Sequence, residues 1–369
     1  MNNSLDAGAP LIKVIGFGGA GCNTISNLHQ GRISQIELIA ANTDFLTLTR
    51  ASADQKIRLG EQTCKGLGAG GDTLIGRIAA EESFRALINA MQGAALVFLT
   101  AGLGGGTGSS AIEIAARIAM SLDIPSISFV SLPFSFESES RKSIALESSL
   151  ALQPFTNTLL TIPNDKMLEE SGKDLPMQLA LQKANTVLNN CLAGLMDLID
   201  HSTMMHIDLS YLLNAIRSGH GIYISKGAGT GPDRVQQAIK DALGNPVFSE
   251  EQFQLSKEAI VKIRGNVSVQ EVDAVCQEIR QRTSSNIEIM PIIANSDESN
   301  EAITISLLLN GLGATPMSYP ISWIAPQAPE KKLAMAIPSE PMDAGYPSTE
   351  DELEIPAFIR KGYNLKNRD

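Results

Sequence analysis

Several features that define common protein classes are scarce or missing in this 369-residue chain. It has only four cysteines, Cys22, Cys64, Cys191 and Cys276, which lie far apart without CxxC spacing, so neither disulfides nor zinc sites are expected. No apolar run reaches the ~18 residues of a membrane span, and residues 1–10 lack the basic start and apolar core of a signal peptide. We therefore expect a cytoplasmic protein without direct membrane insertion.

Basic residues are also in the minority: 29 Lys and Arg stand against 40 Asp and Glu, a formal net charge of −11. Nucleic-acid backbones are bound by clustered Lys and Arg that displace counterions, so nucleic acid is not an expected partner. The four histidines are scattered, and no metal site is predicted. The remaining composition, 43% hydrophobic and 19% charged, is that of a globular protein long enough for two domains and a tail.

The most informative segment present is a glycine loop between a predicted strand and a predicted helix. The apolar run 96–101 is followed by Gly104-Gly105-Gly106-Thr107-Gly108-Ser109 and then by a helical pattern that begins at Ala111. Consecutive glycines let backbone N–H groups curl around an anion, and the helix start adds unpaired donors and a positive dipole end. The segment therefore predicts a phosphate site, although a lone glycine run is more often a flexible turn.

A second glycine loop, Gly16–Gly21, follows the first predicted strand, precedes a helical pattern from Cys22 to Leu28 and matches GxGxxG. Taken alone, it is typical of an NAD-dependent Rossmann enzyme, with Asp44 where a ribose-binding carboxylate would stand, about 20 residues on. That class does not require the loop at Gly104 or the third glycine-rich stretch, 65–72. Three such loops at one sheet edge fit a nucleoside triphosphate better, and the sequence has no GxxxxGK[ST] motif of a P-loop ATPase.

Apolar strand-like runs alternate with helical patterns as far as Asn164, which predicts an α/β fold with a parallel, doubly wound sheet. The expected strands are 11–15, 36–41, 96–101, 126–132 and 158–162. A long helix is expected over 175–199. The elements of a smaller α+β half are helices 208–218, 232–243 and 269–282 and strands 259–264, 287–293 and 303–309.

These patterns divide the chain into a flexible N-terminus (1–10), a nucleotide-binding domain (11–174), a central helix (175–200), a C-terminal α+β domain (201–313), a linker (314–350) and a terminal peptide (351–369). The linker is predicted to be disordered because 8 of the 17 prolines fall between Pro316 and Pro356. The terminal peptide regains apolar residues behind an acidic start. A frayed terminus is one interpretation; we favour a partner-binding segment. Its candidate contacts are Leu353, Ile355, Pro356, Phe358, Ile359 and Arg360.

Taken in order, several segments resemble FtsZ, the bacterial tubulin homologue, over nearly the whole chain. They are IKVIGFGGAGCN, AANTD, KGLGAGGD, AGLGGGTGSS, LPFSFESESR, IPND, GAGTGPDR and ELEIPAFIRK. The resemblance implies a tubulin/FtsZ-like fold with a Rossmann-like nucleotide-binding domain, and a filament with GTP or GDP between consecutive subunits. It also implies that the terminal peptide docks a division or membrane-anchoring adaptor at the division site. Whether magnesium accompanies the nucleotide is left open.

The resemblance also implies which residues hold the nucleotide. The backbone donors that wrap the phosphates belong to Gly18, Gly19, Ala20, Gly21, Cys22 and Asn23 on one side and to Gly104, Gly105, Gly106, Thr107, Gly108 and Ser109 on the other. The remaining contacts are Ala69, Gly70 and Gly71 at the terminal phosphate, Asn42 and Asp44 beneath the phosphate loop, Glu137 and Arg141 at the ribose, and Asn164, Leu181, Asn185 and Thr186 at the base. For Glu137 and Arg141 an i,i+4 ion pair is the alternative.

Two departures from the family pattern bear on mechanism. In the first, Leu181 stands where the family has a base-stacking Phe, and Thr186 where it has an Asp that receives the guanine protons. Base–aromatic stacking is worth about 1–3 kcal/mol, and a hydroxyl cannot accept paired donors as a carboxylate does. Nucleotide binding is expected to survive, with weaker selection of guanine over adenine.

The second departure follows the central helix, where the family's NxDxxD loop is delivered by the next subunit to polarise the attacking water. His206, Asp208 and Tyr211 occupy those positions here. One carboxylate is lost, and a positioned acid–base group contributes about 10²–10⁴ in rate. We expect slow hydrolysis in self-filaments, with Asp208 as the catalytic residue and His206 either a proton acceptor or a surface histidine. A structural or regulatory paralogue, joining filaments alone or with a conventional FtsZ, is the other interpretation.

Overall fold

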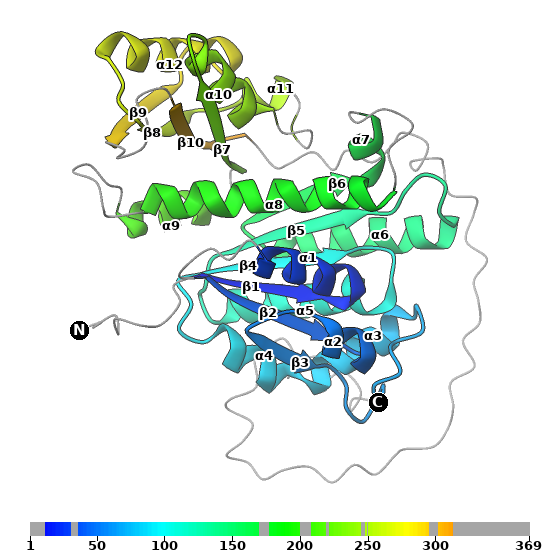
Figure 1. The fold of residues 1–369 in the computed structure, drawn as a ribbon. Helices are drawn as coiled ribbons and strands as arrows, with labels where there is room; N and C mark the ends of the chain where they lie inside the picture. The colour runs from blue at the N-terminus through cyan, green and yellow to red at the C-terminus, as the bar shows by residue number, and fades with distance from the viewer. Residues whose placement is uncertain are drawn as a thin grey trace, which may run out of the picture. The chain divides into compact units, whose positions relative to one another are not determined.

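Two β-sheets carry the fold in the computed structural model (Figure 1). The structure describes residues 12–30, 36–169, 177–199, 208–218, 221–244, 248, 250–294 and 302–312, which all belong to one compact unit. The predicted N-terminus, linker and terminal peptide, as well as His206, lie outside these residues. The domain limits at 174, 200 and 313 also fall outside them and stay predictions.

The first sheet has six parallel strands in the order β3-β2-β1-β4-β5-β6. They are β1 (Ile12–Phe17), β2 (Ile36–Asn42), β3 (Gln55–Arg58), β4 (Leu96–Gly102), β5 (Ser126–Leu132) and β6 (Thr158–Pro163). Five of the six match the apolar runs of the sequence, so the predicted doubly wound α/β sheet is confirmed. The short edge strand β3 was not expected, because its sequence, Gln-Lys-Ile-Arg, has a single apolar residue.

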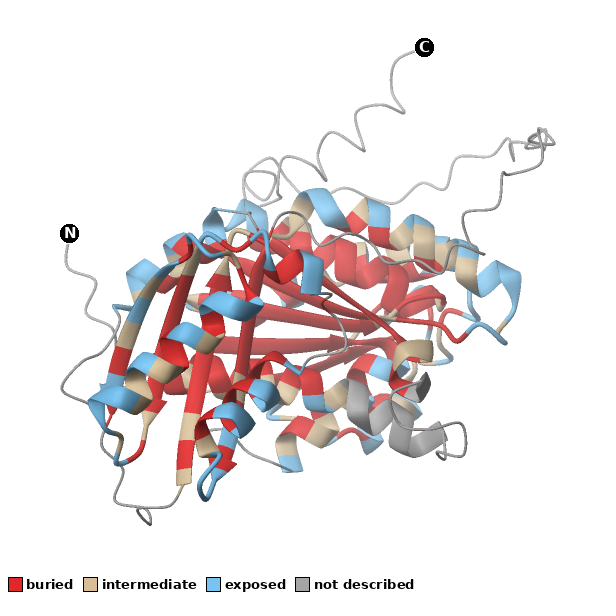
Figure 2. Cartoon of the chain, turned by 90° about the horizontal axis from the view of Figure 1, so that it is seen from above, coloured by how far each residue is buried: buried red, intermediate tan, exposed pale blue. Residues whose placement is uncertain are grey.

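Helices cover this sheet, and its central strands are buried along nearly their whole length (Figure 2). Strands buried on both faces read as continuous apolar runs, which explains why they were visible in the sequence. The covering elements are α1 (Gly18–Gln30), α2 (Phe45–Arg50), α3 (Thr73–Glu82), α4 (Phe84–Met91), α5 (Gly106–Ser121), α6 (Glu139–Leu152), η1 (Gln153–Phe155) and α7 (Asn164–Glu169).

The strand order defines one special crevice. After β1 the chain passes to β2 on one side, and after β4 it passes to β5 on the other, although β1 and β4 are neighbours in the sheet. At such a switch point the loops leaving the two strands diverge, and ligands of open α/β sheets bind outside the carboxyl ends there. Both predicted glycine loops leave from these two strands.

The chain continues through α8 (Met177–Ile199) and α9 (Leu209–Arg217) into a second, smaller sheet of order β7-β10-β8-β9. Its elements are β7 (Ile222–Thr230), α10 (Arg234–Leu243), α11 (Glu250–Phe253), β8 (Glu258–Arg264), α12 (Val269–Arg282), β9 (Glu288–Ala294) and β10 (Ala302–Asn310). The predicted α+β half is thus confirmed. Strand β7 was missed, because Lys226, Gly227 and Gly229 interrupt its apolar pattern. Among the described helices, none combines the length and apolarity needed to span a membrane.

A buried polar cluster ties the end of α8 to the second sheet. The Asp197 carboxylate accepts hydrogen bonds from the Arg264 guanidinium at 2.7 and 3.1 Å and from the Ser306 hydroxyl at 2.7 Å. The ammonium of Lys262, which is fully buried, donates to the Asp197 carbonyl at 2.6 Å. Charged groups this deep are tolerated only when they are paired, so the cluster holds α8 against β8 and β10 in one register.

Candidate functional site

Two helix N-termini meet at the switch point between β1 and β4. Helix α1 begins at Gly18, directly after β1, and α5 begins at Gly106 with Gly105 as its N-cap. Gly18 has φ +68°, and a Cβ added there would stand 3.0 Å from the Gly108 nitrogen, so the two turns touch. The unpaired N–H groups and positive dipole ends of two helices therefore point at one place, which suits a phosphate group.

Both helices begin earlier than the sequence pattern suggested. Helical periodicity predicted starts at Cys22 and Ala111, whereas the structure starts α1 at Gly18 and α5 at Gly106. Glycine has low helix propensity, so these turns read as loops in the sequence, but the packing of the two turns against each other overrides that preference. The predicted phosphate residues are thus the first turns of helices rather than free loops.

The glycine turns line a cavity of about 300 Å³ that opens beside them. Its lining includes Gly18, Gly19, Ala20, Gly105, Gly106, Thr107, Gly108, Glu137, Arg141 and Asn164. Gly104 is not in the lining; it has φ +96° and packs closely against α6, where a Cβ at Gly104 would stand 2.8 Å from the Arg141 carbonyl oxygen. The structure therefore brings most of the predicted phosphate and ribose residues around one space.

Other predicted residues are not in the lining of this cavity. Cys22 and Asn42 are buried, and burial raises the pKa of the Cys22 thiol to about 11, so it stays neutral. The Asp44 carboxylate caps α2 by accepting from the Thr47 N–H at 2.9 Å. Asn23 is exposed and lines a neighbouring cavity instead.

The glycine-rich stretch 65–72 is held at its two ends by α2 and α3. Its start is held by the Phe45 N–H, which donates to the Gly66 carbonyl at 3.0 Å, and its end by Asp72, which caps α3. Ala69 is buried, whereas Gly70 and Gly71 are exposed, with φ of +61° and +84°. A Cβ at Gly106 would stand 2.6 Å from the Asp72 carbonyl, so this stretch ends at the first turn of α5.

Glu137 and Arg141 form the ion pair that the sequence left as an alternative. Their side chains lie 2.7 Å apart, and the other Glu137 oxygen accepts from the Phe134 N–H at 2.9 Å. Both residues nevertheless line the glycine cavity. Since Arg141 has a half-exposed side chain, the pair can open toward a ligand at small energetic cost.

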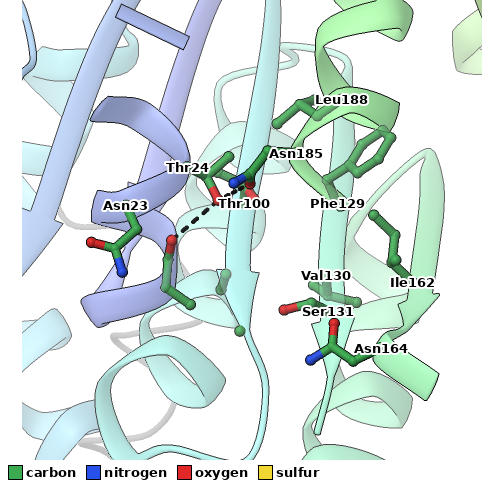
Figure 3. Close-up of a pocket in the computed structure, with 13 residues that line it drawn as sticks. Asn23, Thr24, Thr100, Phe129, Val130, Ser131, Ile162, Asn164, Asn185 and Leu188 are labelled. Carbon is green, nitrogen blue, oxygen red and sulfur yellow. Dashed lines mark hydrogen bonds between the residues drawn. The ribbon is translucent and has the colours of Figure 1, made fainter. Parts of the chain in front are cut away.

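A smaller cavity of about 100 Å³ lies between α1, β5, β6 and α8 (Figure 3). Asn164 borders both cavities; it is 7% exposed, and its side-chain oxygen finds no hydrogen-bond partner among the described residues. A buried acceptor without a donor costs about 1–3 kcal/mol, so this oxygen is suited to a donor on a ligand. Asn185 also faces this cavity and accepts from the Thr24 hydroxyl at 2.9 Å.

The predicted base contacts from α8 are placed unequally. Asn185 is half-buried in the cavity lining, whereas Thr186 is exposed. The side chain of Leu181 lies outside the described residues. Phe129 and Leu188, which the sequence did not single out, line the cavity as well, because β5 and the next turn of α8 meet there.

Asp208 is not near this cavity in the same chain. It is the exposed N-cap of α9, beyond the last residue of α8 at Ile199, and α8 itself spans about 35 Å at 1.5 Å per residue. The far end of α9 contacts the turn before β5, where Arg217 donates to the Asp123 carbonyl at 3.0 Å. That turn lies at the amino end of β5. Helix α9 is therefore at the amino ends of the strands, and the glycine turns are at their carboxyl ends (Figure 1).

Tyr211, at the position of the lost carboxylate, is committed to another partner. Its hydroxyl donates to the carboxylate of Glu258 at the start of β8, and the Asn310 amide donates to the same carboxylate at 3.4 Å. The hydrogen bond to Glu258 and, next, desolvation raise the pKa of Tyr211 to about 12. The phenol therefore stays protonated and joins α9 to the second sheet.

Replacing Tyr211 with Phe is expected to lower the free energy of unfolding by about 0.5–1.5 kcal/mol at neutral pH, because one partly exposed hydrogen bond is lost. The folded-state pKa lies above the ordinary value of 10.0, so this contribution is complete below pH 10 and disappears as the pH rises toward about 12. Urea unfolding of both proteins from pH 8 to 12 measures it. Parallel pH profiles for the two proteins would contradict the prediction.

Comparison with known proteins agrees with this geometry. Residues 11–172 match the family model for the Tubulin/FtsZ family, GTPase domain. The cell division protein FtsZ of Coxiella burnetii is 32% identical over 305 residues, covering 82% of this chain and 79% of that protein. The Neisseria gonorrhoeae FtsZ is 30% identical over 383 residues, 96% of this chain and 95% of its own length.

Solved structures show the same relationship. The FtsZ of M. jannaschii, solved as an empty dimer, superposes with a TM-score of 0.71 at 31% identity, covering 84% of this chain and 90% of that one. CetZ2 of Haloferax volcanii, with a TM-score of 0.65 at 20% identity, shares the fold. The fold and the paired glycine turns define a tubulin-type GTPase domain, and the chain belongs to the Tubulin/FtsZ family. Its GxGxxG motif is therefore part of that domain rather than of an NAD-dependent enzyme.

Proposed function

We propose that this chain is an FtsZ-type cytoskeletal protein that binds GTP and GDP between consecutive subunits of a filament and acts in cell division. The observation that carries the proposal is that the glycine cavity lies at the carboxyl ends of the first sheet's strands, whereas Asp208 lies at their amino ends. A single subunit cannot bring them together. A head-to-tail contact, which repeats without closing, would place the Asp208 of one copy against the cavity of the next.

Exposed apolar side chains around the glycine turns support such a contact. Leu67, Leu46 and Phe136 are 86%, 67% and 69% exposed, and they belong to segments at the carboxyl edge of the first sheet. Single exposed apolar residues are common, but several gathered around a ligand site are typical of a surface that another protein covers. Burial of these side chains would stabilise the filament.

Hydrolysis by filaments of this chain alone is proposed to be slow. Asp208 supplies one carboxylate, and Tyr211 uses its hydroxyl to bind Glu258. The Tyr211–Glu258 pair also favours a second candidate, a structural or regulatory paralogue that binds nucleotide and joins filaments with little turnover. In mixed filaments, a conventional FtsZ neighbour would still deliver a complete catalytic loop to the cavity of this chain.

Sedimentation of the purified protein with GTP, GDP and ATP tests assembly and base choice together. Phosphate release, measured alone and in mixtures with a conventional FtsZ, separates the two candidates: slow release alone supports the assembly GTPase, and no release in either condition supports the paralogue. Rapid release by the protein alone, abolished in Asp208→Ala, would reject slow hydrolysis. Failure to bind any guanine nucleotide would reject the proposal as a whole.

The site is expected to select guanine over adenine weakly. Position 181 offers no aromatic ring, a loss of about 1–3 kcal/mol in stacking, and the exposed Thr186 offers no carboxylate to the base. Competition of GTP and ATP for the monomer, followed with a fluorescent GDP analogue, should show a GTP preference well below a thousandfold. A preference of a thousandfold or more would reject this expectation.

Two further parts of the proposal concern ions and partners. Among the described side chains, no group of three or more His, Cys, Asp or Glu is placed to hold a metal, so Mg²⁺ would arrive bound to the nucleotide phosphates.

The terminal peptide 351–369 is proposed to bind a division or membrane-anchoring adaptor through its apolar residues. Binding of a synthetic peptide of that sequence to candidate adaptors, against one with Ile355 and Phe358 replaced by Ser, tests this part.

A further inference from the structure

We propose that Arg77 and Glu113 hold two phosphate-facing segments in one register and thereby set how strongly the site prefers a nucleoside triphosphate to a diphosphate. The inference rests on the proposed nucleotide site and deepens it. Arg77 lies in α3, directly after the glycine stretch 65–72, and Glu113 lies in the buried face of α5, which follows the turn at Gly104. Both would act as positioning residues, since neither lines the cavity of the glycine turns.

Glu113 is the centre of a buried ionic cluster. It is 3% exposed, and its carboxylate binds the guanidinium of Arg77 through one oxygen and that of Arg117, at 2.6 and 3.0 Å, through the other. The Arg117 guanidinium in turn lies over the Phe155 ring, 4.1 Å from its centre. A carboxylate this deeply buried requires such partners. Arg117 belongs to α5 itself, so the Arg77 guanidinium is the partner that ties α3 to α5.

Helices α3 and α5 meet backbone to backbone close to this ion pair. A Cβ at Gly76 would stand 2.4 Å from the Gly106 carbonyl oxygen and from the Ser110 hydroxyl, and a Cβ at Gly106 would stand 2.6 Å from the Asp72 carbonyl oxygen. Arg77 follows Gly76 directly in α3, so its bond to Glu113 adds a side-chain tie beside this contact and opposes rotation of α3 on α5.

The placement of α3 determines where the exposed glycines stand. Asp72 ends the glycine stretch and caps α3 by accepting from the Leu74 and Ile75 N–H groups at 2.7 and 3.3 Å. Gly70 and Gly71 lie just before it, so a rotation of α3 moves their N–H groups relative to the turn at Gly104. In the proposed nucleotide site, the two helix starts would hold a diphosphate, whereas a terminal phosphate would also reach this stretch. Loosening α3 should therefore weaken the triphosphate selectively.

Arg77→Gln and Glu113→Gln test the inference. We would titrate the full-length monomer, below its assembly concentration, with GDP and with the slowly hydrolysed analogue GTPγS. Affinity for GTPγS is expected to fall about tenfold, which corresponds to about 1.4 kcal/mol, while affinity for GDP changes less than about threefold. Arg77→Gln leaves Glu113 paired with Arg117, so its fold is expected to survive, which thermal unfolding checks.

Glu147→Gln is the matched control. Glu147, Arg77 and Glu113 border a third cavity, which lies apart from the glycine turns. Glu147 is exposed on α6, however, and accepts a hydrogen bond from Ser143 of its own helix. This variant should bind both nucleotides as the wild type does. Equal losses for GDP and GTPγS in Arg77→Gln, or no loss, would overturn the inference while leaving the nucleotide site intact. A wild-type protein that binds neither nucleotide would overturn the proposed function and the inference together.

Discussion

Asp208→Ala is expected to lower phosphate release by filaments of this chain by about 10²–10⁴-fold, because it removes the remaining carboxylate that would polarise the attacking water. Nucleotide affinity of the monomer should not change, since α9 and the glycine turns lie at opposite edges of the first sheet. Single-turnover phosphate release measures the first effect, and titration of the monomer with GDP measures the second.

Asp233→Ala is the matched control for this variant. Asp233 is also an exposed helix N-cap in the second half of the chain, and like Asp208 it makes no side-chain capping hydrogen bond to its described helix. The two replacements therefore remove the same charge from the same kind of position. Equal turnover in Asp208→Ala and the wild type would mean that Asp208 takes no part in hydrolysis. A loss of GDP affinity would place it in the binding site of its own subunit instead.

Gly19→Ala is expected to separate nucleotide binding from folding. A Cβ at Gly19 meets no atom within 4 Å, and the residue lies in the first turn of α1 at the rim of the cavity. Replacing glycine by alanine in a helix stabilises the fold by up to about 1 kcal/mol. The added methyl group enters the space proposed for a phosphate, so affinity for GDP should fall roughly a hundredfold, or about 2.7 kcal/mol.

Gly104→Ala should instead weaken both GDP binding and the stability of the fold. Its φ of +96° and the 2.8 Å approach to the Arg141 carbonyl make any side chain strained there, at a cost of about 1–3 kcal/mol in folding. Thermal unfolding and GDP titration of the two variants distinguish the effects. Unchanged GDP affinity in Gly19→Ala would place the phosphates elsewhere.

The two sets of variants can also be combined. Asp208→Ala keeps an intact cavity, and Gly19→Ala keeps an intact α9. An active junction therefore forms only where α9 of a Gly19→Ala subunit meets the cavity of an Asp208→Ala subunit. A mixture should therefore release phosphate faster than either protein alone. If every mixture were as slow as Asp208→Ala alone, the proposal that catalysis occurs between subunits would be wrong.

Much of the fold was predictable because its signals are local. The strands around Val14, Phe98 and Phe129 are buried on both faces and so appear as apolar runs, and α12 was predicted with its observed limits. The short edge strand β3 and the strand β7 were not predicted, because neither has a continuous apolar run: β3 has one apolar residue, and Lys226, Gly227 and Gly229 interrupt β7.

The site was predictable in part for the same reason. A glycine turn after an apolar run is visible in the sequence, and parallel strands place such turns at one edge. The sequence did not indicate that Gly18 and Gly106 already belong to helices, nor that the side-chain oxygen of Asn164 is left without a donor among the described residues. These properties depend on contacts between segments that are far apart in the sequence, such as Gly18 with Gly108 and Gly106 with Asp72.

By itself, the sequence determined most of the strands, the long helices, the glycine turns and the family, because periodicity and motif spacing are properties of neighbouring residues. Only the tertiary structure decided that Glu113 binds Arg77, that Tyr211 binds Glu258, and that Asp208 stands at the edge opposite the glycine cavity. Each of these is a juxtaposition of residues from different elements. Such pairings are selected when the whole core packs, since burial makes an unpaired charge or donor costly wherever the chain has placed it.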